Sequence, residues 1–407
     1  MIASGTLRCL PWLEFWESSL AFFQTTCLYI INSNSSLRRS PIKTQCLFLV
    51  LLFIAANVFF ACTRKADPSS TATRIVTDVW GREVAIPLQV ETIITLGPGA
   101  PRLAAYLNVI DMLIGAEEYN ARNLTAIRDY NPVHHELFRT LPIVGTGGGS
   151  GNNNSFPEEI IMLAPDVILA GFTREAANEL QAQTGIPVVS VRHNTGLVHN
   201  SFYTAMRVFA ETVGAQERVE EVLSYIDAAM EDLHNRTSGI PDSAKPRVYA
   251  GAITFNGRRG FSGTYSNFGP LAAINALNVA DDAGIYGFYQ VDLEKVVVWD
   301  PDIIFLDPAN MDLVNAEYAI NPNFFRSLRA VQTGRVYTMP AFNFSGTNIT
   351  YALINAYFAG TVLFPEQFAD VCIKEKAAEI LYFFLGKNTF NIMAEAGLFY
   401  GKIRIGE

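Results

Sequence analysis

The residues best suited to bind a ligand lie in one segment, TFNGRRGFSGTYSNFGP at 254–270. Arg258 and Arg259 stand between glycines after a predicted strand, and guanidinium groups pair in a bidentate way with carboxylates and similar oxyanions. Tyr265 and Phe268 supply flat apolar walls beside them. We therefore expect this loop to bind an oxygen-rich anion. The alternative is a pair of solvated loop arginines.

Further candidates follow the ends of other predicted strands. Arg102 lies in the first turn of a predicted helix, where the helix dipole favours an anion over a cation, so a bound anionic ligand would explain it. Arg174 repeats this placement more weakly. The alternatives are arginines that point to water and aromatic rings that belong to the core. The full set of expected ligand contacts is Arg102, Asn153, Arg174, Arg258, Arg259, Tyr265, Phe268, Tyr289, Phe342 and Asn343.

Asn153 belongs to the glycine-rich segment VGTGGGSGNNNSF at 144–156. Its glycines let the backbone approach a ligand closely. It is no Walker phosphate loop, because no Gly-Lys-Ser/Thr follows, and it lacks the GxGxxG spacing. We expect it at the rim of a ligand site, and a mobile surface loop is the alternative.

Histidine, cysteine and serine patterns favour neither a metal centre nor an enzyme. The sequence has no HExxH, CxxC or GxSxG motif. His193, which follows a predicted strand at 187–191, is the histidine best placed to meet a ligand. We expect no catalytic residue, no metal site and no cofactor other than the bound ligand.

Composition narrows the class of protein further. Half of the 407 residues are hydrophobic and 17% are charged, which excludes a disordered chain. The net charge of -9 argues against a nucleic-acid partner. Five cysteines are too few for a disulfide scaffold in a chain of this length.

The N-terminal region reads as an export signal. In RRSPIKTQCLFLVLLFIAANVFFAC at 38–62, basic residues precede an uncharged core of signal-peptide length that ends at Ala61-Cys62. This resembles a bacterial lipoprotein signal, which implies lipidation of Cys62; an uncleaved anchor is the alternative. An upstream start-site error is the simplest account of residues 1–37, and a genuine long leader is the other.

The remaining sequence alternates short apolar strands with amphipathic helices, as in α/β proteins. Strands are expected at 93–96, 167–170 and 187–191. A helix is expected at 215–237, where apolar residues recur every three or four positions on one face. The strand-helix alternation resumes after it, so two α/β lobes with mostly parallel sheets are expected, joined by one long helix.

An internal repeat supports the two lobes. EEIIMLAPDVILA at 158–170 and EKVVVWDPDIIFLD at 294–307 each combine a short helix, Pro-Asp and a buried strand. Glu158 and Glu294 each precede their Pro by seven residues, so the two carboxylates occupy equivalent positions. The alternative reading is that both are ordinary helix-start carboxylates.

These segments, together with TDVWGREVAIP at 77–87, VETIITLGPGAPRLAAYL at 90–107 and TGRVYTMP at 333–340, resemble the substrate-binding proteins of ABC importers for ferric siderophores, haem and cobalamin. The resemblance implies ligand binding in a cleft between lobes, at loops 97–102, 145–156, 171–174, 255–268, 307–310 and 341–347. It also implies that Glu158 and Glu294 dock on the two permease subunits.

The expected protein is an exported, lipid-anchored monomer at the outer face of the membrane or in the periplasm. It hands an iron(III) chelate to an ABC permease and its ATPase. Haem or cobalamin as ligand, a structural or adhesive surface lipoprotein, and an enzyme remain alternatives. The expected organisation is 1–61 leader, 62–73 lipid-anchored tether, 74–214 N-terminal lobe, 215–237 backbone helix, 246–386 C-terminal lobe and 387–407 C-terminal tail.

Overall fold

Two parallel sheets organise the protein in a computed structural model that describes residues 72–148, 152–194, 197 and 200–407. The leader, Cys62 and most of the expected tether lie outside these residues. Residues 71–407 form one compact unit. Within the described residues, no helix combines the length and apolarity needed to cross a bilayer.

The first sheet defines the N-terminal lobe and has the strand order β5-β4-β3-β6-β7. All its pairings are parallel, and the strands in its middle are buried, as expected for a sheet covered by helices on both faces. A separate hairpin of β1 (Thr73–Thr77) and β2 (Glu83–Pro87) precedes it. The sheet strands are β3 (Ile93–Leu96), β4 (Leu113–Glu117), β5 (Ile143–Gly145), β6 (Val167–Ala170) and β7 (Val188–Ser190). Its helices are α3 (Ala100–Tyr106), α4 (Glu118–Arg122), α5 (Asn131–Thr140), α6 (Pro157–Leu163), α7 (Arg174–Thr184) and α8 (Asn200–Val213), with a 3-10 turn at Ile110–Met112.

The second sheet defines the C-terminal lobe and has the order β10-β8-β12-β13, again all parallel. This matches β4-β3-β6-β7 strand for strand. Its strands are β8 (Arg247–Gly251), β10 (Leu277–Asn278), β12 (Ile303–Leu306) and β13 (Val336–Thr338), and β9 (Gly263–Ser266) pairs with β11 (Gly287–Gln290) in an antiparallel ribbon. Its helices are α10 (Gly269–Ala273), α11 (Leu293–Trp299), α12 (Met311–Ile320), α13 (Pro322–Ser327) and α14 (Arg329–Gln332), with 3-10 turns at Asp242–Ala244, Val279–Ala283 and Pro308–Asn310.

The Pro-Asp repeat has the same structural task in both lobes. The Asp166 carboxylate accepts hydrogen bonds from the backbone N–H of Thr92, 2.9 Å, just before β3. The Asp302 carboxylate accepts one from the N–H of Arg247, 2.9 Å, at the start of β8. Asp166 therefore fixes the register of β6 against β3, and Asp302 fixes the register of β12 against β8.

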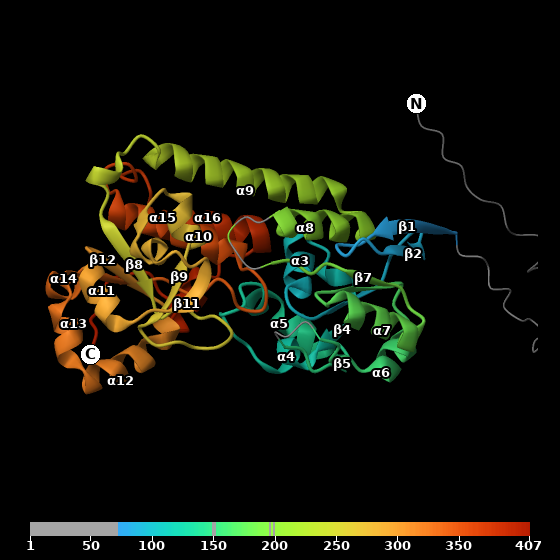
Figure 1. The fold of residues 1–407 in the computed structure, drawn as a ribbon. Coiled ribbons are helices and arrows are strands. Elements are labelled where there is room, and N and C mark those ends of the chain that lie inside the picture. The colour runs from blue at the N-terminus through green and yellow to red at the C-terminus, as the bar shows by residue number, and fades with distance from the viewer. Residues whose placement is uncertain (1–71, 149–151, 195–196, 198–199) are drawn as a thin grey trace, which may run out of the picture. The chain divides into compact units, whose positions relative to one another are not determined.

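The long helix α9 (Gln216–Thr237) runs past the elements of both lobes (Figure 1). All residues of the predicted apolar face are buried except Met230, which is half-buried, and Ala229 and Thr237 are buried in addition. Near its start, Arg218 donates a 3.1 Å hydrogen bond to the Tyr106 carbonyl of the N-terminal lobe. At its end, Thr237 accepts a 2.9 Å hydrogen bond from Asn275 of the C-terminal lobe. The two-lobe architecture with one connecting helix is thus confirmed.

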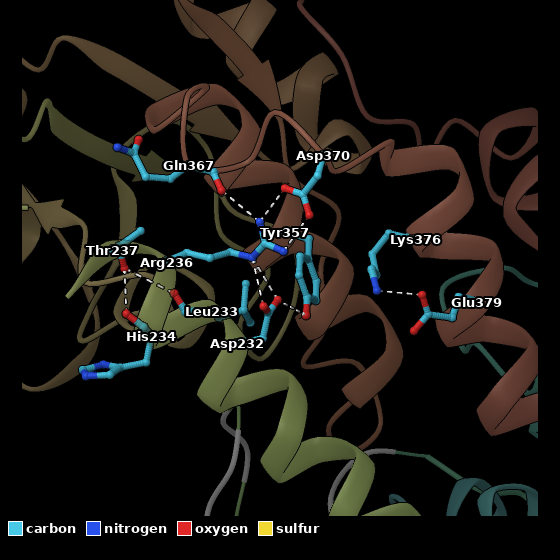
Figure 2. Close-up of polar contacts among 10 residues, drawn as sticks. All are labelled: Asp232, Leu233, His234, Arg236, Thr237, Tyr357, Gln367, Asp370, Lys376 and Glu379. Carbon is cyan, nitrogen blue, oxygen red and sulfur yellow. Dashed lines mark hydrogen bonds and ion pairs between the residues drawn. The ribbon is translucent and has the colours of Figure 1, made fainter. Parts of the chain in front are cut away.

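The end of α9 is also fixed to the loop between α15 (Ile349–Leu363) and α16 (Ile373–Leu385) (Figure 2). Arg236 forms ion pairs with Asp370, at 2.7 Å, and with Asp232. It also donates a hydrogen bond to the Gln367 carbonyl. The hydrogen bonds from Arg236 lower the pKa of Asp370 to about 2. Tyr357 of α15 donates to the same Asp232, so one arginine and one tyrosine join three segments.

The C-terminal region crosses between the lobes instead of trailing from one. In α16, the Phe384 ring packs 4.9 Å from the Tyr106 ring of α3 in the N-terminal lobe. After α17 (Phe390–Glu395) the chain returns to the C-terminal lobe, where Tyr337 of β13 and Lys402 form an antiparallel bridge. Residues expected as a tail therefore cover the edge of β13.

Candidate functional site

A cavity of about 500 Å³ opens where strands of both sheets end. On the N-terminal side the lining residues follow β3, β4, β6 and β7, and on the C-terminal side they follow β8 and β13. Ligands of α/β proteins bind at such carboxyl ends of parallel strands. The lining residues are Pro98, Tyr119, Gly171, Arg192, His193, Thr254, Phe255, Asn256, Gly257, Asn343, Phe344, Ser345 and Gly346.

Two glycines allow the lobes to meet beside this cavity. Gly99 has a φ of +84°, and a Cβ there would lie 2.6 Å from the His193 ring. Gly346 also has a φ of +84°, and its Cβ would lie 2.8 Å from the Gly99 Cα. A side chain at Gly346 would push the loops of the two lobes apart, and one at Gly99 would displace the His193 ring within the N-terminal lobe.

The cavity wall is positively charged. Among the residues that the structure describes, its lining contains Arg192 and no aspartate, glutamate or lysine. The Arg192 guanidinium donates 3.3 Å to the Gly171 carbonyl, which holds it at the wall. Behind Tyr119, the Arg128 guanidinium stacks 3.8 Å from the ring centre. Arg128 is fully buried, and its Nε and Nη1 have no hydrogen-bond partner.

The buried carboxyl group of Glu117 partly offsets the positive charge of these arginines. Glu117, at the end of β4, accepts a 2.7 Å hydrogen bond from the Gly97 N–H. Burial raises the pKa of Glu117 to about 7, so part of its charge is absent near neutral pH. The arginines therefore dominate the electrostatics on this side.

His193 lines the cavity with a neutral ring. Its Nδ1 lies 3.3 Å from the Val191 carbonyl, which can only accept, so Nδ1 carries the proton. Its Nε2 is buried and has no partner. Burial lowers the pKa of His193 to about 4, aided by Arg102 and Arg192, so the ring is neutral at physiological pH.

The C-terminal wall is polar but uncharged where it meets the cavity. The side-chain oxygen of Asn343 is buried without a partner. Thr254 donates 2.6 Å to Asp307, and Asn310 donates 2.9 Å to Thr254, which fixes this edge of the wall. Burial raises the pKa of Asp307 to about 6.

The structure gives Arg102 a different position from the expected one. It is 0% exposed, does not line the cavity, and pairs with Asp129 at 2.7 Å. Its other nitrogens donate to the Ser345 and Phe344 carbonyls, at 2.8 and 3.1 Å. The dipole argument missed that a buried carboxylate and two carbonyls of the other lobe satisfy this guanidinium. Arg102 therefore holds the cavity loop in place from outside the cavity lining.

Arg258 and Arg259 also lie outside the cavity lining, although their loop contributes residues 254–257 to it. Arg258 forms an ion pair with Asp312 at the surface. Arg259 donates 3.1 Å to the Phe255 carbonyl and lies over the Phe288 ring. Charged and backbone groups of their own lobe therefore hold both arginines.

The aromatic candidates form a layer next to the cavity. Phe268 and Phe342 are buried with ring centres 5.4 Å apart and line a small neighbouring pocket, and Tyr265 packs on Phe268. Tyr289 donates 2.7 Å to the Ala280 carbonyl in the C-terminal lobe.

Of the remaining expected contacts, only Asn343 lines the main cavity. Asn153 donates 3.3 Å to Gln183, and Arg174 is exposed at the start of α7.

Sequence reasoning omitted Tyr119 and Arg192 from the expected contacts. Arg192 and His193 directly follow the predicted strand at 187–191, so the strand-end rule used elsewhere would have found both. Tyr119 follows β4, a strand whose short sequence LIGAE has little apolar alternation. Within the described residues, no group of three or more His, Cys, Asp or Glu side chains is arranged to hold a metal ion.

The sequence profile of the family described as periplasmic binding protein matches residues 93–341, more than half of the chain. The chain belongs to this family. That assignment confirms its resemblance to the substrate-binding proteins of ABC importers, and the family implies export from the cytoplasm.

Similar proteins support the same assignment. The molybdate-binding protein MolA of Haemophilus influenzae is 25% identical over 326 residues, which cover 74% of this chain and 88% of MolA. The solved MolA structure with bound molybdate has a TM-score of 0.58 and 21% identity, and covers 77% of this chain and 98% of MolA. A periplasmic solute-binding protein of Veillonella parvula has a TM-score of 0.61 and 20% identity, covering 80% and 97%.

In this periplasmic binding protein, Glu158 and Glu294 occupy matching positions in the first turns of α6 and α11. Both are exposed. Each helix ends in a residue with left-handed backbone, Ala164 or Asp300, whose N–H bonds back into the helix. The repeat therefore persists in three dimensions, one copy in each lobe.

Proposed function

We propose that this protein captures an anionic iron(III) chelate in the cavity between its lobes and delivers it to an ABC permease. The observation that carries the proposal is the cavity itself. It combines Arg192, the neutral acceptor His193 and the amide of Asn343 with a volume suited to a small organic ligand.

The charge of the wall supports an anionic ligand. A cation at a partly enclosed surface attracts carboxylate, catecholate or hydroxamate oxygens, and no carboxylate among the described lining residues opposes them. Buried Arg128 adds a second positive charge behind Tyr119. A buried guanidinium with unpaired nitrogens is costly, so an anion close to it would be strongly favoured.

The state of His193 supports an organic chelate over a bare oxyanion. Its unpaired Nε2 accepts hydrogen bonds. A chelator with O–H or N–H groups can donate to it, whereas a fully deprotonated tetrahedral oxyanion has no proton to give. Filling this acceptor avoids the penalty of a buried unsatisfied group.

A molybdate-like oxyanion is the second candidate, because a relative at 25% identity is named for molybdate binding. In that case His193 must take up a proton and become a donor. The two candidates therefore differ in their dependence on pH.

A thermal-shift panel tests both. It contains the ferric complexes of citrate, a bis-catecholate and a hydroxamate, together with haemin, cyanocobalamin and sodium molybdate. A ligand at 100 times its dissociation constant stabilises the fold by about 2.7 kcal/mol. We expect a ferric chelate to give the largest shift. No shift with any compound would contradict solute capture by this cavity.

The pH profile then separates the candidates. Because the pKa of His193 is about 4, this ring should not change chelate affinity from about pH 5 to 8, and Glu117, with a pKa of about 7, should weaken both kinds of anion alike as it becomes charged. Affinity for molybdate should instead fall by up to about tenfold per pH unit above the pKa of the bound imidazole. His193→Gln cannot titrate and should abolish any such slope.

Docking and anchoring complete the proposal. Glu158 and Glu294 are the docking carboxylates for the permease, and Cys62 carries the lipid. Reversing both charges with Glu158→Arg and Glu294→Arg should stop cellular uptake while ligand affinity is unchanged. Cys62→Ser should release the protein from the membrane fraction. Uptake that survives the double reversal would refute the docking pair.

A further inference from the structure

Two arginines of the N-terminal lobe are completely buried, and their surroundings differ. Arg102 forms an ion pair with Asp129. Arg128 forms no ion pair within the described part of the chain, and its Nε and Nη1 have no hydrogen-bond partner there. Its Nη2 donates to the carbonyls of Tyr119 and Asn123, at 2.9 and 3.0 Å. A buried cation without an ion-pair partner is costly, so folding alone does not explain Arg128.

Tyr119 connects Arg128 to the cavity. The guanidinium lies 3.8 Å from the centre of the Tyr119 ring, and Tyr119 lines the cavity, whereas Arg128 does not. The Tyr119 backbone is fixed as well, because its N–H donates 3.1 Å to the Thr146 carbonyl and its carbonyl accepts from Arg128. A Cβ on Gly147 would lie 2.7 Å from the Tyr119 Cβ, so the glycine-rich segment packs closely on this residue. The ring is therefore held in place with the guanidinium against it.

A cation against a tyrosine ring changes what the ring can bind. The face of an aromatic ring carries partial negative charge and its edge carries partial positive charge. Because Arg128 occupies a face of Tyr119, a cationic ligand is disfavoured there, and negative charge near the ring edge or the hydroxyl is favoured. At a separation of about 7–8 Å and an effective dielectric constant of about 20, one ligand charge changes affinity by about tenfold or more.

We propose that Arg128 is a positioning residue that selects ligand charge through Tyr119, so that the cavity prefers multiply charged anions over less charged anions of the same shape. This inference rests on the proposed capture of a solute and names the charge class of that solute. Arg192 at the cavity wall contacts one anionic group directly, and Arg128 favours a second negative charge without touching it. The two cations together match a ligand that is at least a dianion.

Two pairs of probes test this preference at constant shape. Molybdate is a tetrahedral dianion, and perrhenate is a tetrahedral monoanion. The iron(III) and titanium(IV) complexes of one hexadentate tris-catecholate are a trianion and a dianion. Because the charge of Glu117 would offset part of that of Arg128, calorimetric titrations are run at about pH 6, where Glu117, with a pKa of about 7, is mainly protonated. We expect the parent protein to prefer the more negative member of a pair by about tenfold or more.

Three variants locate the source of the preference. Arg128→Met replaces a buried unpaired charge by an apolar side chain, so its melting temperature should be unchanged or higher, and its affinity ratio within a pair should fall by about tenfold. Arg128→Lys keeps the charge and should keep part of the preference. Arg122→Met is the matched control, because it changes the net charge equally but removes only an exposed arginine of α4 that pairs with Glu118. It should bind with the ratio of the parent protein.

Each other outcome overturns the selection of charge by Arg128. An equal loss of affinity for both members of a pair in Arg128→Met, with the ratio unchanged, would show that Arg128 only supports Tyr119. The same fall of the ratio in Arg122→Met would assign the preference to the net charge of the protein. If Arg128→Met does not fold, complete loss of the preference in a folded Arg128→Lys would overturn the proposal. Binding of neither pair by the parent protein would do so too, and the ligand panel decides separately whether the cavity captures a solute.

Discussion

The two lobes share a sheet order but differ at the cavity they enclose. Strands β4-β3-β6-β7 and β10-β8-β12-β13 correspond, and an aspartate after proline fixes the register in each. At the cavity, the N-terminal lobe supplies Arg192 and His193, whereas the C-terminal lobe supplies aromatic, amide and hydroxyl groups. The repeated features thus belong to the framework and the outer helices, and the unrepeated ones belong to the ligand site.

Because of this difference, substitutions in the repeated features and substitutions at the cavity should have different consequences. A change in a repeated feature should alter stability or docking, and its counterpart in the other lobe should respond similarly. A change at the cavity should alter ligand affinity, with charge effects confined to the N-terminal side. The following substitutions test that division.

Removing the arginine that joins the lobes should have the largest effect. Arg102→Met leaves Asp129 buried without its partner and releases the Phe344 and Ser345 carbonyls. Breaking a buried ion pair in this way costs about 3–5 kcal/mol in the free energy of unfolding, measured by urea denaturation. The matched control Arg139→Met loses only an exposed pair with Glu136 and should change stability by less than about 0.5 kcal/mol. Equal effects would refute the joining role.

The buried carboxyl of the N-terminal lobe should make stability depend on pH. Burial raises the pKa of Glu117 to about 7, so the folded state holds a proton that the unfolded chain releases near pH 4. The protonated Glu117 therefore makes its full contribution to the free energy of unfolding below about pH 4, and this contribution is lost as the pH rises toward 7. Because Glu117→Gln cannot titrate, its decrease in the free energy of unfolding over this pH range should be smaller by up to about 3 kcal/mol.

Urea titrations at about pH 5 and pH 8 check this slope. Asp307→Asn in the C-terminal lobe should show the same sign, with its loss complete near pH 6. An unchanged difference between the two pH values in Glu117→Gln would show that this carboxyl is not protonated in the fold.

Substitutions at the cavity should weaken ligand binding more in the N-terminal lobe than in the C-terminal lobe. Arg192→Gln removes a charge-assisted contact and should weaken binding of the compound selected in the ligand panel by about tenfold or more. Asn343→Ala, on the uncharged wall, should cost about two- to tenfold. Calorimetric titration measures both, and a larger loss for Asn343→Ala would reverse the assignment of charge recognition to the N-terminal lobe.

The smallest effects are expected within the arginine pair of the 254–270 loop. Arg259 donates to the carbonyl of Phe255, a cavity residue, so Arg259→Ala should weaken binding by a few-fold through loop disorder. Arg258→Ala loses a surface pair with Asp312 and a 3.1 Å hydrogen bond to Asn310, which keeps its own bonds to Ala252 and Thr254, so affinity should change by less than about twofold. If Arg258→Ala weakens binding as strongly, direct contact with the ligand must be reconsidered.

The fold could be predicted because its signals are local. Apolar strands, the three-to-four spacing of α9 and the Pro-Asp repeat each depend on neighbouring residues. The loops at the strand ends were predictable for the same reason, and Pro98, Gly171, Phe255 and Asn343 line the cavity within them.

The direction of individual side chains was not predictable. Arg102 and Arg192 both sit near a strand end with a similar local sequence signal. Only the tertiary structure shows that Asp129 and two carbonyls from beyond residue 340 surround Arg102, whereas Arg192 remains at the cavity wall. Asp129 lies 27 residues from Arg102 and the two carbonyls more than two hundred, so no local spacing rule reaches them.

The crossing of α16 back to the N-terminal lobe has a consequence for biogenesis. The Phe384 ring packs against Tyr106, and Arg218 donates a 2.6 Å hydrogen bond to the Phe383 carbonyl. Helices α3 and α9 therefore reach their final packing only when α16, a helix near the C-terminus, is present. An exported chain emerges from its N-terminus first. We therefore expect the packing of α3 and of the start of α9 to be completed only after almost the whole chain has been translocated, so that final folding takes place on the far side of the membrane.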